Sequence, residues 1–313
     1  MIRRMAMLAA TFSAAACSAA PSTVVTGMPE RLTLPVPTMA GGTDCATLAS
    51  GAETTPVQLR RTFAEPFDKL DMRRWTPHFD GGYDWPVKRY LEGNGEQQIY
   101  VDKGYRGTAP NPLGLDPFSI RDGVLTITGS AVPAKALPYL YGRRYMSGLL
   151  TTRTSLVQTY GYFEMRGRIP AGQGLWPAFW LIPADKSWPP EIDVMEARGR
   201  EPAMIPMSVH WKENGVGPHK GTGCKPRVED STTAFHLYGA LWQADRITFY
   251  IDRKPVGTLA RPPGVDRPMY MLVNLAMGGR YGGNIDATTP LPARMDVDHI
   301  AAYAIVPPPG GKR

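Results

Sequence analysis

One stretch of this 313-residue chain, residues 188–196 with the sequence WPPEIDVME, restricts the local fold more than any other. Its β-branched Ile192 and Val194 favour extended backbone. The two prolines near its start prevent a helix from beginning there, and Gly199 follows its end. The stretch therefore predicts a β-strand.

Three acidic residues in this strand are spaced so that they can share one face. Side chains alternate between the two faces of a strand, so Glu191 and Asp193 lie on the same side. Strict alternation would place Met195 on that side next and Glu196 on the other. We therefore expect a β-bulge that absorbs one extra residue and returns Glu196 to the face of the other two acids.

Carboxylates gathered on one face repel each other, but they can serve catalysis. At about 3.3 Å of rise per residue, the α-carbons of Glu191 and Glu196 lie roughly 13 Å apart. Glutamate side chains that lean together over a curved sheet could narrow this to the roughly 5 to 5.5 Å between the carboxyl groups of retaining glycosidases. One would attack the sugar, and the other, kept protonated by its negative neighbours, would protonate the leaving oxygen. On spacing alone, a solvated acidic face and a divalent-metal site stay open as alternatives.

Short alternating runs elsewhere indicate that the folded part is all-β. Gly and Pro turns separate them, and the chain shows no repeats and no long helical pattern. A stretch of about 250 residues can form a single all-β domain. We therefore expect a β-sandwich or jelly roll over residues 57–307. The runs that carry this prediction are 124–128, 160–169, 247–251 and 298–305.

Motifs on both sides of the acidic strand resemble glycoside hydrolase family 16. They are NGEQQ (94–98), DGVLTI (122–127), GYFEMR (161–166), GQGLWPAFWL (172–181), FHLYG (235–239), DRITFYID (245–252), NLAMGG (274–279) and MDVD (295–298). The acidic stretch itself is similar to the family's bulged catalytic signature. The resemblance covers roughly residues 60–306, and the co-occurrence of these motifs is more specific than any one of them.

The resemblance implies a concanavalin-like jelly roll of two antiparallel sheets with a concave substrate cleft. It implies that Glu191 is the nucleophile, that Glu196 is the general acid and then the base, and that Asp193 holds a proton near Glu191. The expected activity is that of a retaining, laminarinase- or licheninase-like endo-β-glycanase, which cuts a β-1,3- or β-1,3-1,4-glucan or a related bacterial exopolysaccharide. The expected protein is a monomer that needs no organic cofactor. The family often carries a structural calcium, whose ligands the sequence does not locate.

Aromatic and polar residues near the acidic strand are candidates for substrate binding, because sugar rings stack on flat aromatic surfaces. By strand parity Trp176 and Trp180 share a face, and the resemblance places both near the cleft. It also suggests His210 beside the carboxylates, and Glu96 and Asn94 on the glycone side. The alternative is that the tryptophans are ordinary core residues and the histidine an ordinary strand residue.

Several positions depart from the β-1,3-glucanase members of the family. Many of these have Arg at Leu149 and Trp-Pro-Gly at residues 281–283, where this chain has Tyr281 as a further candidate for substrate contact. These differences weaken a laminarin-specific interpretation. The formal net charge of +7 would attract an anionic polysaccharide, unless the arginines are merely solvated. The arginines are scattered and no nucleic-acid motif is present, so we do not expect a nucleic-acid partner.

The two ends of the chain predict export and little structure. Residues 1–20 carry Arg3, Arg4 and a short Ala-rich apolar stretch, as in a secretory signal, and Cys17 resembles the cysteine of a bacterial lipoprotein signal. We expect an extracellular or periplasmic protein, held at the outer membrane if Cys17 is lipidated. Residues 21–56 predict a Pro/Thr/Gly-rich lead-in, and residues 308–313 a disordered tail. With Cys17 used by lipid, Cys45 and Cys224 could form a disulfide or stay free.

Other functions remain open on the same fold. The site could pass the sugar to another sugar instead of water, as a transglycosylase does, or it could cut a β-galactan, as agarases and carrageenases do. The sandwich could also bind carbohydrate without cutting it. A structural lipoprotein of the cell surface has only the N-terminal extension and Cys17 in its favour.

Overall fold

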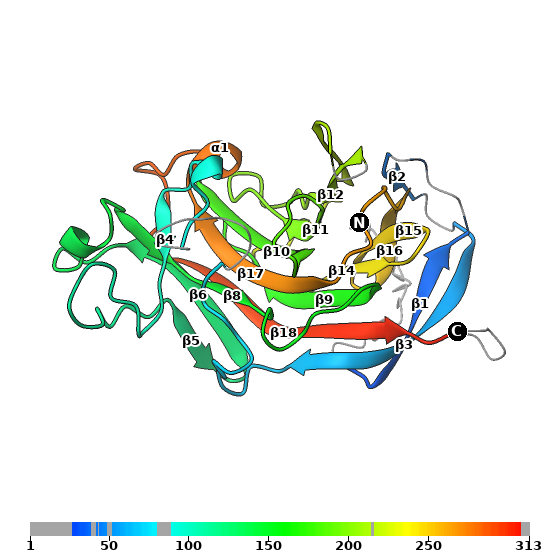
Figure 1. Cartoon of the computed structure of the whole chain (residues 1–313), viewed down its shortest axis with the longest axis horizontal. Helices are drawn as coiled ribbons and strands as arrows, with labels where there is room; N and C mark the ends of the chain where they lie inside the picture. The colour runs from blue at the N-terminus through cyan, green and yellow to red at the C-terminus, as the bar shows by residue number, and fades with distance from the viewer. Residues whose placement is uncertain are drawn as a thin grey trace, which may run out of the picture.

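The computed structural model describes residues 27–38, 42, 44–48, 52–79, 89–213 and 216–307. These residues form two β-sheets that pack face to face, with β10 and β17 of one sheet above β9 and β18 of the other (Figure 1). The helices in this part of the chain are one turn long: η1 (Glu92–Asn94), η2 (Leu137–Tyr139) and α1 (Gly279–Gly282). The prediction of an all-β jelly roll is confirmed. None of these helices is long and apolar enough to cross a membrane.

The larger sheet contains twelve strands within the described residues. Its main order is β2-β16-β15-β14-β9-β18-β6-β7-β4, with β3 pairing β18 and β1, and β5 pairing β6. All pairs are antiparallel except β4 with β7. The bounds are β1 (Arg31–Pro37), β2 (Ala46–Thr47), β3 (Thr54–Glu65), β4 (Gln98–Tyr100), β5 (Phe118–Arg121), β6 (Val124–Ala131), β7 (Tyr145–Ser147), β9 (Gly161–Arg168), β14 (His236–Trp242), β15 (Arg246–Ile251), β16 (Lys254–Ala260) and β18 (Ala293–Ile305).

The smaller sheet contains six antiparallel strands in the order β13-β12-β11-β10-β17-β8. Its bounds are β8 (Leu149–Thr151), β10 (Leu175–Pro183), β11 (Glu191–Glu196), β12 (Met207–Lys212), β13 (His219–Cys224) and β17 (Met269–Met277). Every residue of β10 and β17 is buried, because these strands lie in the middle of the sheet. One face of this sheet packs on the core, and the other carries the acidic residues of β11.

Every second side chain of the central strands points into the core between the sheets. Phe179 and Leu181 of β10 point into it, as does Ile192 of β11. Trp75 and Trp242 are fully buried there. Since strand side chains alternate, the residues between these core positions in β10 face away from the larger sheet. This alternation presents a row of aromatic side chains beside β11.

The predicted start of the folded part is wrong. The sequence predicts an irregular lead-in over residues 21–56, but β1 pairs along its length with β3, from Arg31 opposite Arg60 to Pro37 opposite Thr54. Leu34 of β1 is buried against tyrosines on the outer face of the larger sheet. The fold therefore includes residues 31–56 in part, and β1 covers a face that would otherwise expose aromatic rings.

Two prolines explain why this strand is hard to recognise. Pro35 and Pro37 have no N–H to donate, but β1 is an edge strand that pairs with β3, where proline is tolerated. The alternating apolar residues are only Leu32, Leu34 and Val36. So short a run, interrupted by proline, does not stand out from the Thr- and Gly-rich residues on either side.

The disulfide lies where the two sheets meet. Cys45 and Cys224 are bonded, with α-carbons 5.4 Å apart, and they join the residue before β2 to the last residue of β13. These are outer strands of the larger and the smaller sheet respectively. The bond therefore links the two sheets at one side of the molecule.

Some predictions lie outside the described residues. These are the signal segment at residues 1–20 with Cys17 and the tail at residues 308–313.

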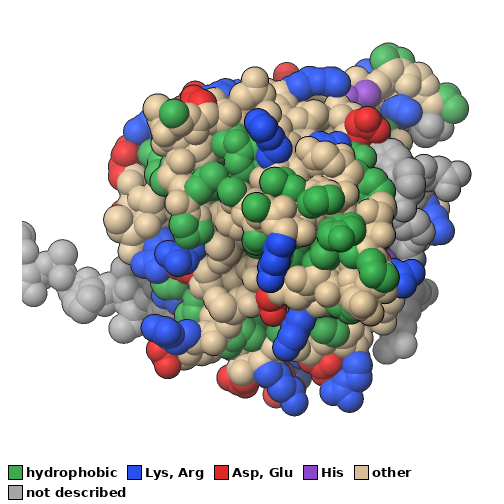
Figure 2. Space-filling model, turned by 90° about the vertical axis from the view of Figure 1, so that its left-hand side faces the viewer, with side chains coloured by type: hydrophobic (Ala, Val, Ile, Leu, Met, Phe, Trp, Pro, Cys, Tyr) green, Lys and Arg blue, Asp and Glu red, His purple; other side chains and the backbone are tan. Residues whose placement is uncertain are grey.

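The end of the molecule drawn in Figure 2 carries Lys and Arg side chains spread among hydrophobic and acidic ones, as expected for a chain with formal net charge +7.

Candidate active site

A β-bulge in β11 brings the three acids to one side of the smaller sheet. Trp180 of β10 lies opposite Asp193, and Phe179, one residue before it, lies opposite Met195. Val194 is thus the extra residue, at the point where the sequence pattern requires one. Beyond the bulge, Glu196 lies opposite Ala178.

The acids and the predicted substrate-binding residues line one cleft. Its wide part, of about 910 Å³, is bordered by Glu191, Glu196, Trp176, Trp180, His210, Asn94 and Tyr281. The adjoining deeper part adds Asp193 and Glu96. The structure therefore brings together all the catalytic and substrate-binding candidates, which the sequence spreads over almost 200 residues.

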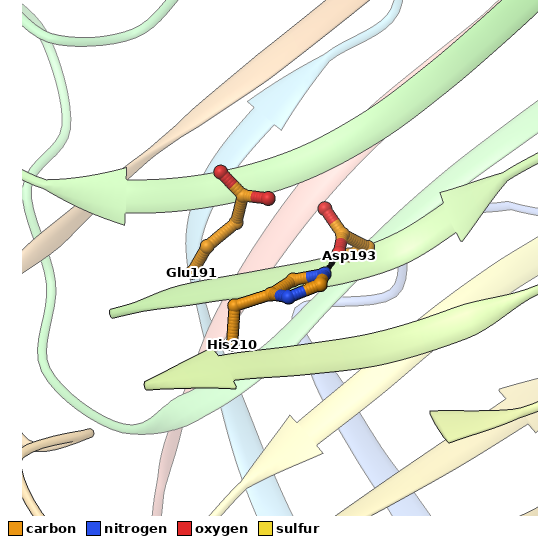
Figure 3. Close-up of side chains that lie close together, drawn as sticks. All are labelled: Glu191, Asp193 and His210. Atoms are coloured by element: carbon orange, nitrogen blue, oxygen red, sulfur yellow. Dashed lines mark ion pairs between the residues drawn. The ribbon is translucent and has the colours of Figure 1, made fainter. Parts of the chain in front are cut away.

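Asp193 is held by two donors from the neighbouring strand β12. Its Oδ2 accepts a hydrogen bond of 2.5 Å from Ser208 Oγ and lies 3.1 Å from His210 Nε2. Figure 3 shows the His210 ring beside Asp193, with Glu191 projecting from the same strand as Asp193. One side-chain nitrogen or oxygen from each of Glu191, Asp193 and His210 lies within 4.8 Å of the others. The three groups therefore interact electrostatically.

Each of the two glutamates accepts a hydrogen bond from an indole. Trp188 Nε1 donates to Glu191 Oε2 at 2.9 Å, and Trp176 Nε1 donates to Glu196 Oε1 at 3.0 Å. The indoles are thus positioned both to orient the carboxyl groups and to offer apolar surface to a sugar. Trp188 is 42% exposed, so its ring faces the open side of the cleft.

Trp180, the third tryptophan described in the cleft, is held by hydrogen bonds that involve residues of β17 and β4. Trp180 Nε1 donates to Asn274 Oδ1 at 2.7 Å, and Asn274 Nδ2 donates to the Tyr100 hydroxyl at 3.0 Å. Trp180 is 6% exposed. Because its N–H is already satisfied, this ring offers the cleft an apolar face in a set orientation.

Tyr281 and Glu96 border the cleft from other segments. Tyr281 lies in α1, its ring is 5.1 Å from that of Trp176, and its hydroxyl donates to the backbone oxygen of Glu196 at 3.2 Å. Glu96 is buried and accepts hydrogen bonds from Leu91 N and Gln98 Nε2. Burial raises the pKa of Glu96 to about 7 in spite of these bonds.

The electrostatics of the site favour a protonated Glu196. Burial, and then the charge of Asp193, raise the pKa of Glu196 to about 8. The same two causes raise the pKa of Glu191 above its ordinary value. Burial alone would lower the pKa of His210, but its hydrogen bond with Asp193 and the nearby acidic charges raise it to about 9. At neutral pH the cleft therefore contains an imidazolium at His210 and a protonated carboxyl group at Glu196.

One cluster in the cleft contains metal-type ligands but suits calcium poorly. Glu191, Asp193 and His210 are the one group of three such ligands this close together in the described part of the chain. One of the three donors is an imidazole nitrogen, whereas calcium prefers oxygen ligands. The structural calcium implied by the resemblance thus remains a prediction without placed ligands.

Three residues that contact the acids or His210 were not among the predicted site residues. Ser208 is two residues before His210, so strand parity could have placed it on the same face. Trp188 begins the acidic stretch, but its bond to Glu191 depends on how the chain turns into β11. His219, whose Nε2 lies 2.9 Å from His210 Nδ1, has no signal in its local sequence, because the pairing of β12 with β13 brings it there.

Comparison with known proteins agrees with this architecture. The family model described as glycosyl hydrolases family 16 matches residues 122–300, more than half of the chain. The endo-1,3-1,4-beta-glycanase ExsH of Rhizobium meliloti (strain 1021) is 40% identical over 255 residues, which cover 79% of this chain and 52% of that protein. The chain thus spans about half the length of this relative. The beta-glucanase of Rhodothermus marinus is 31% identical, and the match covers 83% of this chain and 90% of that protein.

Solved structures lead to the same family. The laminarinase catalytic domain from Thermotoga maritima superposes with a TM-score of 0.64 at 26% identity, covering 78% of this chain and 98% of that one. The endo-beta-1,3-glucanase from Pyrococcus furiosus superposes with a TM-score of 0.63 at 29% identity, covering 80% and 96%. With the sequence match, the bulged acidic strand and the two-sheet fold in agreement, the chain belongs to glycosyl hydrolase family 16.

Proposed function

We propose that this protein is a retaining endo-β-glycanase that hydrolyses internal bonds of a β-1,3- or β-1,3-1,4-glucan or a related exopolysaccharide. The observation that carries the proposal is the bulged strand β11, which presents Glu191, Asp193 and Glu196 to a single cleft. Membership of family 16 and the names of the relatives support the reaction class.

In the first step, a Glu191 oxygen forms a bond to the anomeric carbon while the bond from that carbon to the leaving oxygen breaks. Glu196 gives its proton to this oxygen, and its raised pKa keeps it protonated for that purpose. Glu191 must be ionised to attack. The charge of Asp193 favours the protonated form of Glu196. The Trp188 N–H and the His210 charge stabilise the Glu191 carboxylate.

In the second step, water replaces the sugar on Glu191. Glu196, now a carboxylate, takes a proton from this water as the water oxygen bonds to the anomeric carbon. The bond between that carbon and Glu191 breaks, and both glutamates return to their starting states. Two inversions at the same carbon leave its configuration unchanged, which makes the enzyme retaining. A sugar hydroxyl in place of water would give transglycosylation.

A reducing-end assay on a panel of polymers tests the proposal. The panel contains laminarin, mixed-linkage β-glucan, agarose, carrageenan and an acidic bacterial exopolysaccharide. We expect the wild type to cleave one of the β-glucans or the exopolysaccharide, and Glu191→Ala to cleave none. Added azide or formate should partly restore the variant, because a small anion can take the place of the lost carboxylate.

Two results would contradict this proposal. Full activity in Glu191→Ala would remove this residue as nucleophile. A folded wild type that binds an oligosaccharide, seen as quenching of tryptophan fluorescence, but cuts no member of the panel would favour a carbohydrate-binding protein.

We also propose that the protein is exported and that Cys17 is lipidated. The Arg-containing, Ala-rich start of the chain supports export, and a Cys45–Cys224 disulfide suits an oxidising compartment. Cell fractionation with and without globomycin tests this. We expect protein in the membrane fraction and an unprocessed form under globomycin, and a cytoplasmic protein of full length would contradict export.

A further inference from the structure

His219 begins β13, an outer strand of the smaller sheet, and its ring contacts two side chains of the active site. Its Nε2 lies 2.9 Å from His210 Nδ1, and its ring centroid lies 5.1 Å from that of Trp188. Each of these neighbours in turn contacts an acid. His210 Nε2 lies 3.1 Å from Asp193, and Trp188 Nε1 donates to Glu191. His219 therefore contacts one partner of Asp193 and one partner of Glu191.

The protonation states of the two histidines decide which one donates. Nearby acids keep His210 protonated at neutral pH, whereas burial and the His210 charge lower the pKa of His219. An imidazolium donates from both ring nitrogens, and a neutral imidazole accepts at one. His210 therefore donates through Nε2 to Asp193 and through Nδ1 to His219.

Two glycines of β13 allow this close approach. Gly221 lies opposite His210, and Gly223 lies opposite Ser208, the two residues that hold Asp193. A β-carbon at Gly221 would lie 2.7 Å from His210 Nδ1, and one at Gly223 would lie 2.9 Å from the α-carbon of Ser208. Both distances are shorter than van der Waals contact. The outer strand is thus closely fitted to both partners of Asp193.

We propose that His219 is a positioning residue for the active-site acids. By accepting the Nδ1–H of His210, it sets the plane of that ring so that the Nε2–H stays directed at Asp193. By packing on Trp188, it holds the indole N–H on Glu191. The catalytic consequence rests on the proposed function, but the contact between the histidines can be measured without substrate.

Three variants of the full chain separate the two contacts. His219→Phe keeps a ring against Trp188 but cannot accept a hydrogen bond, His219→Gln offers an acceptor oxygen without the ring, and His219→Ala removes both. Lys220→Ala is the matched control, since this neighbouring side chain pairs with Glu213 and does not line the cleft.

Kinetics on the panel polymer that the wild type cleaves test the catalytic part. Loss of one hydrogen bond to a charged group should lower kcat about tenfold in His219→Phe, and His219→Ala should lose more. We expect KM and the melting temperature to stay near wild type, His219→Gln to recover part of kcat, and Lys220→Ala to behave as wild type. A raised KM with unchanged kcat would overturn the proposal, because His219 would then bind sugar directly.

Proton NMR of the protein with ¹⁵N-labelled histidine tests the contact itself. The chain has only five histidines, which makes assignment practicable. We expect a low-field Nδ1–H resonance from His210 in the wild type, in Lys220→Ala and in His219→Gln, and its loss in His219→Phe and His219→Ala. A resonance unchanged in all variants would overturn the contact. If the wild type cleaves no polymer but the resonance is lost as expected, the contact is supported and the proposed function is contradicted.

Discussion

Replacing both Cys45 and Cys224 with alanine removes the covalent link between the two sheets. The bond joins the residue before β2 to the last residue of β13, which are outer strands of different sheets. β13 also carries His219 and lines the cleft. We expect this double variant to fold but to be much less stable than the wild type.

The size of the loss follows from the length of chain that the bond closes. Cys45 and Cys224 are 179 residues apart. Opening a loop of this length lowers the free energy of the unfolded chain by about 5 kcal/mol in the chain-entropy model. Removal of native disulfides typically lowers the free energy of unfolding by about 2 to 5 kcal/mol. We therefore expect a loss of about 4 kcal/mol in the free energy of unfolding. For a domain of this size, that corresponds to a fall of about 8 to 16 °C in melting temperature.

Urea unfolding followed by tryptophan fluorescence measures this loss. Excess dithiothreitol should destabilise the wild type to the level of the double variant and should leave the variant itself unchanged. This comparison separates the bond from any packing effect of the alanines. A loss below about 1 kcal/mol by both routes would contradict this prediction, because the cross-link would then not restrict the unfolded chain as the loop length requires.

Three further predictions concern catalysis. Glu196, the proposed acid, has a pKa raised to about 8, so kcat on the polymer should fall tenfold per unit well above pH 8, and a rate still rising at about pH 9 would contradict this role. Glu196→Ala should lose polymer cleavage but retain cleavage of aryl glycosides with good leaving groups, and equal losses on both would remove its role as acid. Added salt should slow cleavage of an anionic polymer and leave cleavage of a neutral polymer unchanged, because salt at 0.1 M screens interactions between charges over about 10 Å. An anionic polymer cleaved equally at low and high salt would contradict attraction by the basic surface.

Much of the fold and of the site could be predicted from local sequence. The alternation of Glu191 and Asp193, with one residue too many before Glu196, was sufficient to predict the bulge found at Val194. Parity likewise placed Trp176 and Trp180 on one face. Such features depend on the two-residue period of a strand, which is a property of neighbouring residues. The same logic failed for β1, where prolines interrupt a short alternation that only pairing with β3 stabilises.

Local sequence patterns thus predicted the all-β class, the bulged acidic strand and the face that it shares with its tryptophans. The partners that reach the acids depend on how distant strands pack and pair. The pairing of β12 with β13 brings His219 to His210, and the turn into β11 places the Trp188 indole on Glu191. It also decided the protonation of Glu196, because that depends on burial and on the charge of Asp193. Register between distant strands and exclusion of water are properties of the whole fold, so local sequence does not encode them.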